Sequence, residues 1–466
     1  MADRAVPHRI AASIALGTLL NPLNSSMIAV GLVALQGEFH VTLATSSWLI
    51  SGFYLAASVS QPVMGRLADR YGPRRVFSAG LTLVGATGIL VLFAPGFGWV
   101  VAARVLQAIG TSVGFPAGLA VIRRLAGGRP PAGTLGVISA ANSASAAFGP
   151  VLGGVLVGAF GWRGIFAVNI PLAATGLFLA RRWLPADPPR PPADTRSLVR
   201  DLDLPGVALF AVTVTALLGL LLSANWALLP VVPAAAALLA WRELRAGVPF
   251  LDLRELRARP KLIGVLGQQV AVQCVFYLIF FGLPQWLERV AGHSAAATGL
   301  LMLPVSALGV VLTPVAARVV RRSGAGLSML IGSLGLLTGA ALLLSVGGGS
   351  GPAQIVAIGA VLGLPLAFNN LGLQAGLYAA APPDQTGTAA GLFQTGRYVG
   401  AILSTALLGA VYGGTPSTAG LHRAALVVVV GAVLLVVAAP FTPAPGGRHR
   451  ARPASHSAPE TSRPAR

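Results

Sequence analysis

The feature that most constrains this chain is a succession of long apolar runs, many of eighteen residues or more, separated by short gaps that hold most of the charge. A run of this length is enough for a helix to cross the hydrocarbon core of a bilayer. Only 10% of the 466 residues are charged, whereas a soluble domain carries about 25%. The pattern therefore predicts an all-α membrane protein that crosses the bilayer many times.

The apolar runs predict fourteen transmembrane helices. Their ranges are 10–34, 46–69, 76–95, 98–122, 134–160, 163–181, 204–222, 226–242, 261–286, 296–320, 325–346, 353–379, 386–412 and 420–440. Gaps rich in proline or charge flank the seventh and eighth helices, so we expect two six-helix bundles plus an inserted helix pair. The expected parts are an N-terminal six-helix bundle at 1–183, a linker with two inserted helices at 184–260, a C-terminal six-helix bundle at 261–441 and a disordered cytoplasmic tail at 442–466.

The basic residues predict the orientation of the chain. The net charge of +20 comes almost entirely from arginines in the short gaps, and Lys261 is the only lysine. With both termini on one side, the gaps on the opposite side hold only Arg163, Arg289 and Arg423. Cytoplasmic loops carry the excess of basic residues. We therefore expect a multi-pass protein of the bacterial inner (plasma) membrane with both termini in the cytoplasm, and no nucleic acid partner.

Four short motifs suggest a family. The stretch GRLADRYGPRR, Gly65 to Arg75, resembles the loop signature of the major facilitator superfamily, and RVLQAIGTS resembles its helix 4 motif. The antiporter motif of helix 5 is matched by Gly136, Gly149, Pro150 and Gly153, with Ser145 where a glycine is usual. GWRGIFAVNIP, Gly161 to Pro171, looks like a signature of the fourteen-helix drug:proton antiporters. The resemblance implies a secondary active exporter of amphipathic organic compounds, of the multidrug efflux type, that works by alternating access and exchanges its substrate for protons.

The resemblance also assigns a gate to the first of these motifs. Its gating residues are Gly65, Asp69, Arg70, Gly72, Arg74 and Arg75. A carboxylate at Asp69 can pair with a nearby arginine, or face the N-terminus of the helix that begins near Asp384. The alternative is a charge cluster that only sets topology. In helix 5, Gly149, Pro150, Gly153 and Gly154 give a smooth, bendable face, which we expect to pack between the two halves.

Polar side chains recur at helical spacing inside the expected spans. Gln269, Gln273 and Tyr277 lie at i, i+4 and i+8, as do Asn370, Gln374 and Tyr378, so each set shares one helix face. We expect a substrate cavity lined by Asn21, Asn24, Tyr54, Arg104, Gln107, Gln269, Gln273, Tyr277, Asn370, Gln374 and Arg397. The alternatives are interhelical hydrogen bonds, snorkelling of Arg104 to the outer surface, and anchoring of Arg397 to backbone carbonyls or Gln394.

Acidic residues are missing from the middle of every expected span. In the fourteen-helix family a helix 1 motif usually carries an aspartate, and Asn24 takes that position here. An amide does not titrate near neutral pH, so a proton would need Asp69, Glu38 or a charge on the substrate. Proton coupling therefore stays open.

The same absences exclude several classes of function. No carboxylate cluster and no GxxxxGK[ST] loop occurs, so we expect no enzyme activity, metal or cofactor. The single Cys274 permits no intrachain disulfide. We expect a monomer whose partners are the lipid bilayer and a small-molecule substrate. A dedicated exporter of a single metabolite or a self-made antibiotic is the alternative function.

Overall fold

A computed structural model describes most of the chain, and the regular structure of the described residues is helical. These residues are 7–126, 132–187, 203–223, 225–247, 249, 253–381, 386–413 and 415–443. Asp384 and the tail from 444 onward lie outside the described residues. The prediction of an all-helical fold is therefore confirmed for the part of the chain that is described.

The helices follow one another with short connections. The first part of the chain forms α1 (His8–Phe39), α2 (Leu43–Ser46), α3 (Trp48–Tyr71), α4 (Pro73–Leu92), α5 (Phe97–Thr111), α6 (Gly114–Leu125), α7 (Ala132–Phe160), α8 (Arg163–Ala167) and α9 (Asn169–Trp183). The middle part forms α11 (Leu204–Ser223), the 3-10 turn η1 (Trp226–Leu228), α12 (Val231–Arg245) and α13 (Leu253–Ala258). The last part forms α14 (Pro260–Arg289), α15 (Ala295–Leu343), α16 (Pro352–Leu362), α17 (Leu364–Ala380), α18 (Thr386–Tyr412), α19 (Thr418–Ala438) and η2 (Ala439–Phe441).

Several expected spans differ locally from these helices. The ranges 296–320 and 325–346 are joined in the 49-residue α15, but Gly324 inside it has φ 87° and ψ 174°. Glycine readily adopts a positive φ, whereas residues inside an α-helix do not. The helix therefore ends at Gly324 and the chain turns back. The expected helix at 353–379 is instead divided at Gly363 into α16 and α17.

Ten helices in the described part are long and apolar enough to cross a membrane. The multi-pass architecture is thus supported, and the count of fourteen stays a prediction. Three helices of at least twenty residues, α3, α11 and α18, are not among the ten. Of these, α3 and α18 carry polar side chains well inside their length, including Gln61 in α3 and Arg397 in α18.

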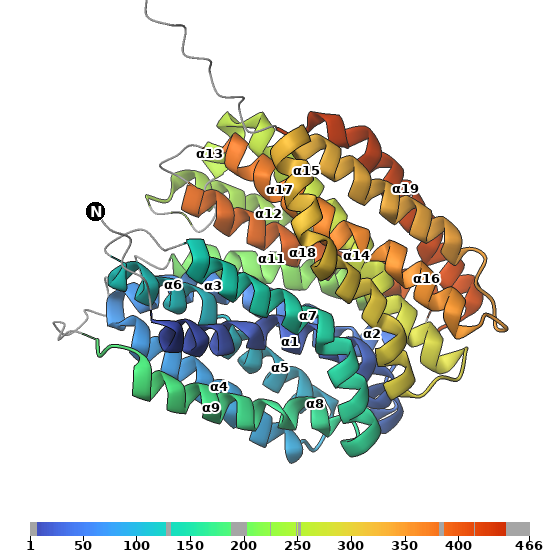
Figure 1. The fold of residues 1–466 in the computed structure, drawn as a ribbon, viewed down its shortest axis with the longest axis horizontal. Coiled ribbons are helices and arrows are strands. Elements are labelled where there is room, and N and C mark those ends of the chain that lie inside the picture. Colours follow the sequence, from blue (N-terminus) through green and yellow to red (C-terminus); the bar gives the residue numbers. More distant parts are fainter. Residues whose placement is uncertain are drawn as a thin grey trace, which may run out of the picture.

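The helices form two bundles that lie side by side (Figure 1). Helices α1 to α9 make the lower one in this view and α14 to α19 the upper one. We call the end where α1 begins at His8 and α19 ends at Ala438 the terminal face, and the end where α1 ends at Phe39 and α19 begins at Thr418 the distal face. The bundles meet along three helix pairs, α7 with α15, α3 with α18 and α1 with α14.

The helix pair α11 and α12 lies beside the place where the bundles meet (Figure 1). α11 contacts both α3 and α18, so it touches one helix of each bundle. At the terminal face the pair is fastened by an ion pair of 2.5 Å between Arg242 Nη2 and Asp203 Oδ1.

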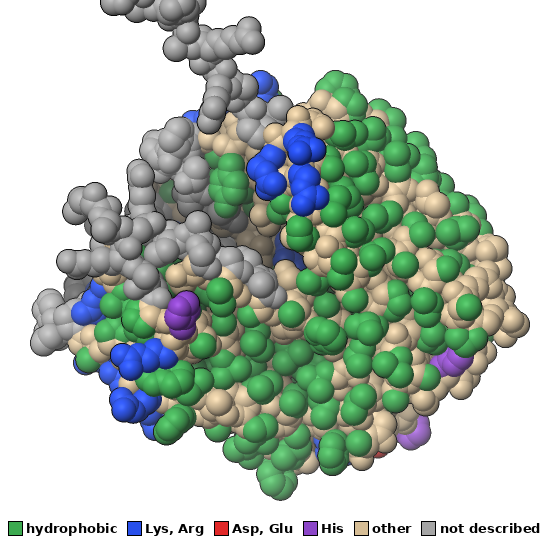
Figure 2. Space-filling view, in the orientation of Figure 1, with side chains coloured by type: hydrophobic (Ala, Val, Ile, Leu, Met, Phe, Trp, Pro, Cys, Tyr) green, Lys and Arg blue, Asp and Glu red, His purple; other side chains and the backbone are tan. Residues whose placement is uncertain are grey.

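The outer surface is apolar over much of the bundles, as Figure 2 shows. In α19 the large side chains Val430, Leu434 and Val437 are 62–65% exposed, whereas the small side chains Ala425 and Ala432 are buried against the neighbouring helices. Exposing Leu and Val in water is unfavourable, and in lipid it is not. The large apolar side chains exposed on the outer side of α19 therefore fit a bilayer environment.

Candidate functional site

The two bundles are fastened to each other near the distal face. Ser51 Oγ of α3 and Thr405 Oγ1 of α18 lie 2.6 Å apart and are fully buried. Gln36 of α1 donates to Gln285 Oε1 of α14 at 3.0 Å. Toward the terminal face, by contrast, Figure 2 shows a hollow between the bundles with a basic side chain visible inside it. Among the described residues the bundles are thus in contact near the distal face, and a hollow lies between them toward the terminal face.

Glycines allow α7 to approach α15 closely at the distal end. A Cβ at Gly154 would lie 2.4 Å from the carbonyl oxygen of Ala295, and one at Gly299 would lie 2.5 Å from that of Pro150. Real Cβ atoms do not approach backbone oxygens this closely, so these positions admit no side chain while the face is closed.

The remaining glycines of the antiporter motif face a different neighbour. A Cβ at Gly149 would collide with Ser26 of α1, and one at Gly153 with the backbone of Met27. Gly149 and Gly153 therefore pack within the N-terminal bundle, and the expected contact between halves is made by Gly154 and Pro150. Gly136 lies in α7, near its terminal-face end.

Three tyrosines meet in the interface between the two bundles, which we call the seam. The ring of Tyr54 in α3 lies 5.6 Å from Tyr277 in α14 and 5.6 Å from Tyr398 in α18. Tyr277 also stacks on Phe281, with centroids 5.2 Å apart and planes 12° apart. We call Tyr54, Tyr277 and Tyr398 the tyrosine cluster. It brings together residues far apart in the sequence and from both bundles, including the predicted site residues Tyr54 and Tyr277.

Polar groups border the tyrosine cluster. Gln61 Nε2 donates to Tyr398 Oη at 2.6 Å, and Gln394 Nε2 donates to the same oxygen at 3.5 Å. Arg397 Nη2 donates to Tyr277 Oη at 3.4 Å. The Tyr54 hydroxyl is buried near the polar side chains of Tyr277 and Ser25, and it makes no hydrogen bond of standard geometry within the described part of the chain. Arg397 was predicted from its depth in the helix, and the structure places it beside the cluster rather than on backbone carbonyls.

Arg104 and Gln107 lie inside the N-terminal bundle. The Arg104 side chain is 1% exposed. It donates to Gln107 Oε1 at 2.7 Å and to the backbone oxygens of Asn24 and Leu49 at 3.2 and 3.4 Å. Its guanidinium carbon lies 4.3 Å from the centre of the Phe53 ring. Arg104 therefore does not snorkel to the surface. It ties α5 to α1 and α3, and no carboxylate among the described residues pairs with it.

Asn24 differs from its expected place on a central cavity. Its side chain is fully buried and forms a reciprocal amide pair with Asn169 of α9, with hydrogen bonds of 2.6 and 2.9 Å. An amide pair satisfies both groups between two helices of the same bundle, which explains why the side chain turns away from the seam. Asn21 likewise donates to Thr111 Oγ1 of α5 at 3.1 Å.

The polar sets predicted on one face of α14 and of α17 have few hydrogen-bond partners among the described residues. Gln269 is fully buried, and neither atom of its amide has a partner in the described residues. Gln273, one turn further along α14, is 4% exposed. In α17, Asn370 donates to the Leu366 oxygen at 2.9 Å, and Gln374 is exposed. Tyr378, the last member of that stripe, is 58% exposed.

The loop of the gate motif is held by Asp187, which lies in the predicted linker. Asp187 accepts hydrogen bonds from the backbone N–H groups of Arg74 at 3.2 Å and Arg75 at 2.9 Å, and so caps the start of α4. Gly72 has φ 103°, and a Cβ there would collide with the Asp187 carboxylate. The sequence shows an acidic residue at Asp187. Nothing in the sequence indicates that the chain folds back and brings this residue to the loop of the gate motif.

The gate residues themselves lie at the terminal face. Asp69 is exposed in the last turn of α3, and Arg70 follows it. A Cβ at Gly65 would make an ordinary contact of 3.5 Å with Pro116 of α6. The helix end expected to face Asp69, at residues 382–385, lies outside the described residues, and α18 is described from Thr386.

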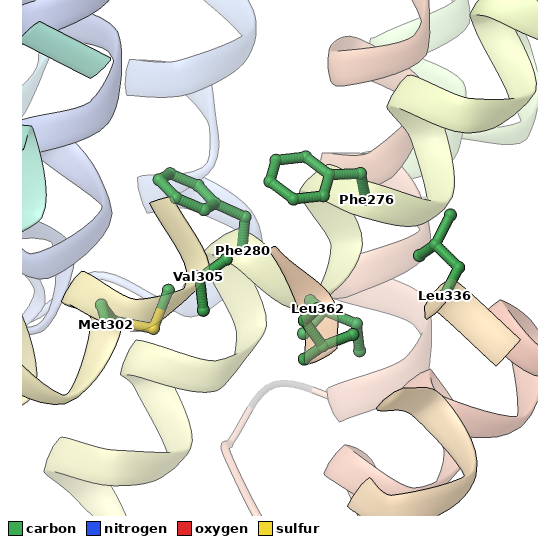
Figure 3. A pocket seen from close by; sticks show the side chains of 7 residues that line it. Phe276, Phe280, Met302, Val305, Leu336 and Leu362 are labelled. Atoms are coloured by element: carbon green, nitrogen blue, oxygen red, sulfur yellow. The ribbon is translucent and has the colours of Figure 1, made fainter. Parts of the chain in front are cut away.

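A small apolar pocket lies within the C-terminal bundle (Figure 3). It is lined by side chains of α14, α15 and α16, among them Phe276, Phe280, Met302 and Leu362. The space for the centre of a water-sized sphere is about 10 Å³. Because sites for drug-sized ligands have several hundred Å³, this pocket does not hold the substrate.

Two helical bundles, an apolar outer surface, a seam closed at one face only and polar groups from both bundles at its closed end define a multi-pass membrane transporter. The profile of the Major Facilitator Superfamily matches residues 14–405. The chain belongs to this superfamily, as the sequence motifs predicted.

Relatives and solved structures agree with this assignment. The chain is 37% identical to "Uncharacterized MFS-type transporter YwoD" of Bacillus subtilis, over 91% of this chain and 95% of the relative. It is 30% identical to "Tetracenomycin C resistance and export protein" of Streptomyces glaucescens, over 87% of this chain and 76% of the relative. The fold is similar to a crystal structure of a peptide transporter POT, with a TM-score of 0.69 at 16% identity and coverage of 93% and 94%.

Proposed function

We propose that this protein is a fourteen-helix exporter of amphipathic organic compounds in the bacterial plasma membrane. The terminal face is then cytoplasmic, in keeping with the arginines of its loops. The proposed parts are the N-terminal bundle at 1–183, the linker and inserted pair at 184–260 and the C-terminal bundle at 261–441. A relative named for the resistance to and export of an antibiotic supports the direction of transport.

The observation that carries the proposal is the tyrosine cluster. It lies between the bundles, where a substrate entering from the hollow would meet the closed seam, and it combines aromatic faces with hydroxyl, amide and guanidinium groups. Sites for organic ligands typically combine apolar walls with a few polar groups. In this proposal Gln273, Asn370 and Gln374 line the approach. Arg104, Gln107, Asn21 and Asn24 hold α1, α5 and α9 together behind the N-terminal side of the site.

Alternating access then requires the distal contacts to break. Opening of the distal face separates Ser51 from Thr405 and Gly154 from Ala295, while the terminal face closes over the cluster. Closure of the terminal face would bring Asp69 toward the N-terminal end of α18, where a carboxylate is favoured by the helix dipole. Asp187 keeps the loop in shape for this contact.

Exchange against protons is part of the proposal, as in the antiporters that the motifs resemble. Asn24 cannot carry the proton, and its pairing with Asn169 removes it from the seam. The acidic candidates are Asp69 and Glu38, the latter ion-paired with Arg163 at 3.3 Å at the distal face.

Efflux of a fluorescent dye from proteoliposomes with and without an imposed pH gradient tests this function. Uphill movement that collapses with the gradient supports an antiporter. Efflux that does not depend on the pH gradient refutes proton exchange but not export. If no amphipathic compound is moved, export itself is refuted.

A dedicated exporter of one compound is the second candidate, because one relative is named for a single antibiotic. Expression in an efflux-deficient host with a panel of toxic compounds separates the two. Resistance to many compounds favours the multidrug exporter, and resistance to one favours the dedicated exporter.

A further inference from the structure

Each bundle holds an arginine deep in a helix, and neither arginine has an acidic partner. Arg104 lies in α5 and Arg397 in α18, and among the described residues no carboxylate forms an ion pair with either of them. The described acidic residues lie at or near helix ends or outside the spans, for example Asp69 and Glu38. A buried charge without a counterion is costly, so this arrangement calls for an explanation.

The two arginines differ in how far their hydrogen bonds are used. Arg104 has acceptors for Nε, Nη1 and Nη2 and lies over the Phe53 ring, and its side chain is almost completely buried. It cannot reach a ligand and supplies a fixed positive charge. Arg397 is only half-buried, and the structure gives it one long hydrogen bond, to Tyr277. Its remaining N–H groups are left for another acceptor.

The surroundings of Arg397 fit an aromatic acid. A planar guanidinium binds a carboxylate through two parallel hydrogen bonds. The rings of Tyr54, Tyr277 and Tyr398 offer faces for an aromatic body. In the same place a cation would meet the positive charge of Arg397 and no acid among the described residues, which disfavours it.

We propose that Arg397 and the tyrosine cluster form a binding subsite for an organic anion with an aromatic body. The inference rests on the proposed exporter function and narrows its substrate class from amphipathic compounds in general to those that carry a carboxylate or phenolate. Arg397 binds the anionic group, the tyrosine rings hold the aromatic body, and Arg104 adds positive charge from the N-terminal bundle.

Fluorescein and rhodamine 6G test the subsite, because they share a xanthene ring system and differ in charge. Binding of each dye to the purified full-length protein is measured by fluorescence anisotropy at a pH at which fluorescein is an anion, and efflux of each is measured from proteoliposomes. The wild type is expected to bind fluorescein more tightly than rhodamine 6G. Loss of a charge-assisted hydrogen bond in Arg397→Gln is expected to weaken fluorescein binding by roughly 10- to 100-fold.

Three control measurements distinguish loss of the anion subsite from a general loss of dye binding. Rhodamine 6G binding by Arg397→Gln is expected to be unchanged or tighter, which also shows that the variant is folded. Arg397→Lys keeps the charge and is expected to lose less fluorescein affinity than Arg397→Gln. Arg423→Gln removes an exposed arginine at the distal end of α19 and is expected to bind both dyes as the wild type does.

The opposite results overturn the inference. A wild type that prefers rhodamine 6G, or an Arg397→Gln variant that loses both dyes equally, contradicts an anion subsite but leaves the exporter function standing if either dye is moved. If proteoliposomes move neither dye, the proposed function itself is contradicted along with the inference.

Discussion

Gly154 gives the sharpest perturbation of the closed distal face. A Cβ at this position would lie 2.4 Å from the Ala295 oxygen and 3.2 Å from the Ala296 Cα. These neighbours are backbone atoms of α15 that cannot rotate away. Ordinary contact begins at 3.4 Å, so Gly154→Ala requires α7 and α15 to separate by about 1 Å. Such overpacking costs about 1–3 kcal/mol, and only the state with the distal face closed bears this cost.

The population ratio of distal-open to distal-closed molecules should therefore rise between about 5- and 150-fold in Gly154→Ala. Spin labels at positions 75 and 321 report the change, because both side chains are exposed at the terminal face, on α4 and α15 respectively. Cys274 is replaced first, so that only the two introduced cysteines are labelled. We expect the variant to shift the label distance toward the shorter, terminal-closed population.

Gly158→Ala is the matched control, one turn further along α7. A Cβ there would contact the Cβ of Ala296 at 3.7 Å, which is ordinary van der Waals contact. Its distance distribution should match that of the wild type. The reasoning is refuted if Gly154→Ala leaves the distribution unchanged, or if Gly158→Ala shifts it as strongly.

Three further predictions concern the N-terminal bundle and its gate. Asn24→Ala and Asn169→Ala should each lower the free energy of unfolding by about 1–2 kcal/mol, because the remaining amide loses its partner; the double variant should lose clearly less than the sum, and additivity would contradict the pair. Asp187→Ala should cost about 1 kcal/mol in a thermal unfolding measurement through loss of the α4 cap, with Asp187→Asn close to wild type; equal melting temperatures of all three proteins would exclude a cap. Asp69→Asn should slow turnover in a transport assay without weakening substrate binding, and an equal loss of both would argue against a gate.

The sequence is informative about the helices because every span must stay apolar over the length needed to cross the hydrocarbon core of the bilayer. Apolar length locates the helices, including the two that meet at Gly324, whereas the interruption at Gly363 is not indicated by apolar length. Helices α3 and α18, which are not among the ten apolar spans, bring Gln61 and Arg397 to the seam, and the apolar helix α14 brings Tyr277. Apolar length alone therefore does not distinguish the helices that form the candidate site.

Partners within the site are harder to predict than the residues themselves. Helical spacing identifies Tyr54 and Tyr277 as polar groups in spans, but not that their rings meet across the bundles. Asn24 was predicted to line the cavity because it is a polar residue inside an apolar run, whereas its partner Asn169 lies 145 positions away in the sequence and could not be identified from spacing. Which side of a helix faces a cavity depends on the rotation set by packing, as with Gly149 against Ser26, and this is a tertiary property.

A reversible lock on the distal face tests alternating access most directly. Ser51 and Thr405 have side-chain oxygens 2.6 Å apart across α3 and α18, so cysteines at both positions, in a chain without Cys274, are well placed to form a disulfide. We predict that the oxidised variant binds substrate from the terminal face but does not move it across proteoliposome membranes, and that reduction restores transport. Undiminished transport by the fully cross-linked protein would contradict the account.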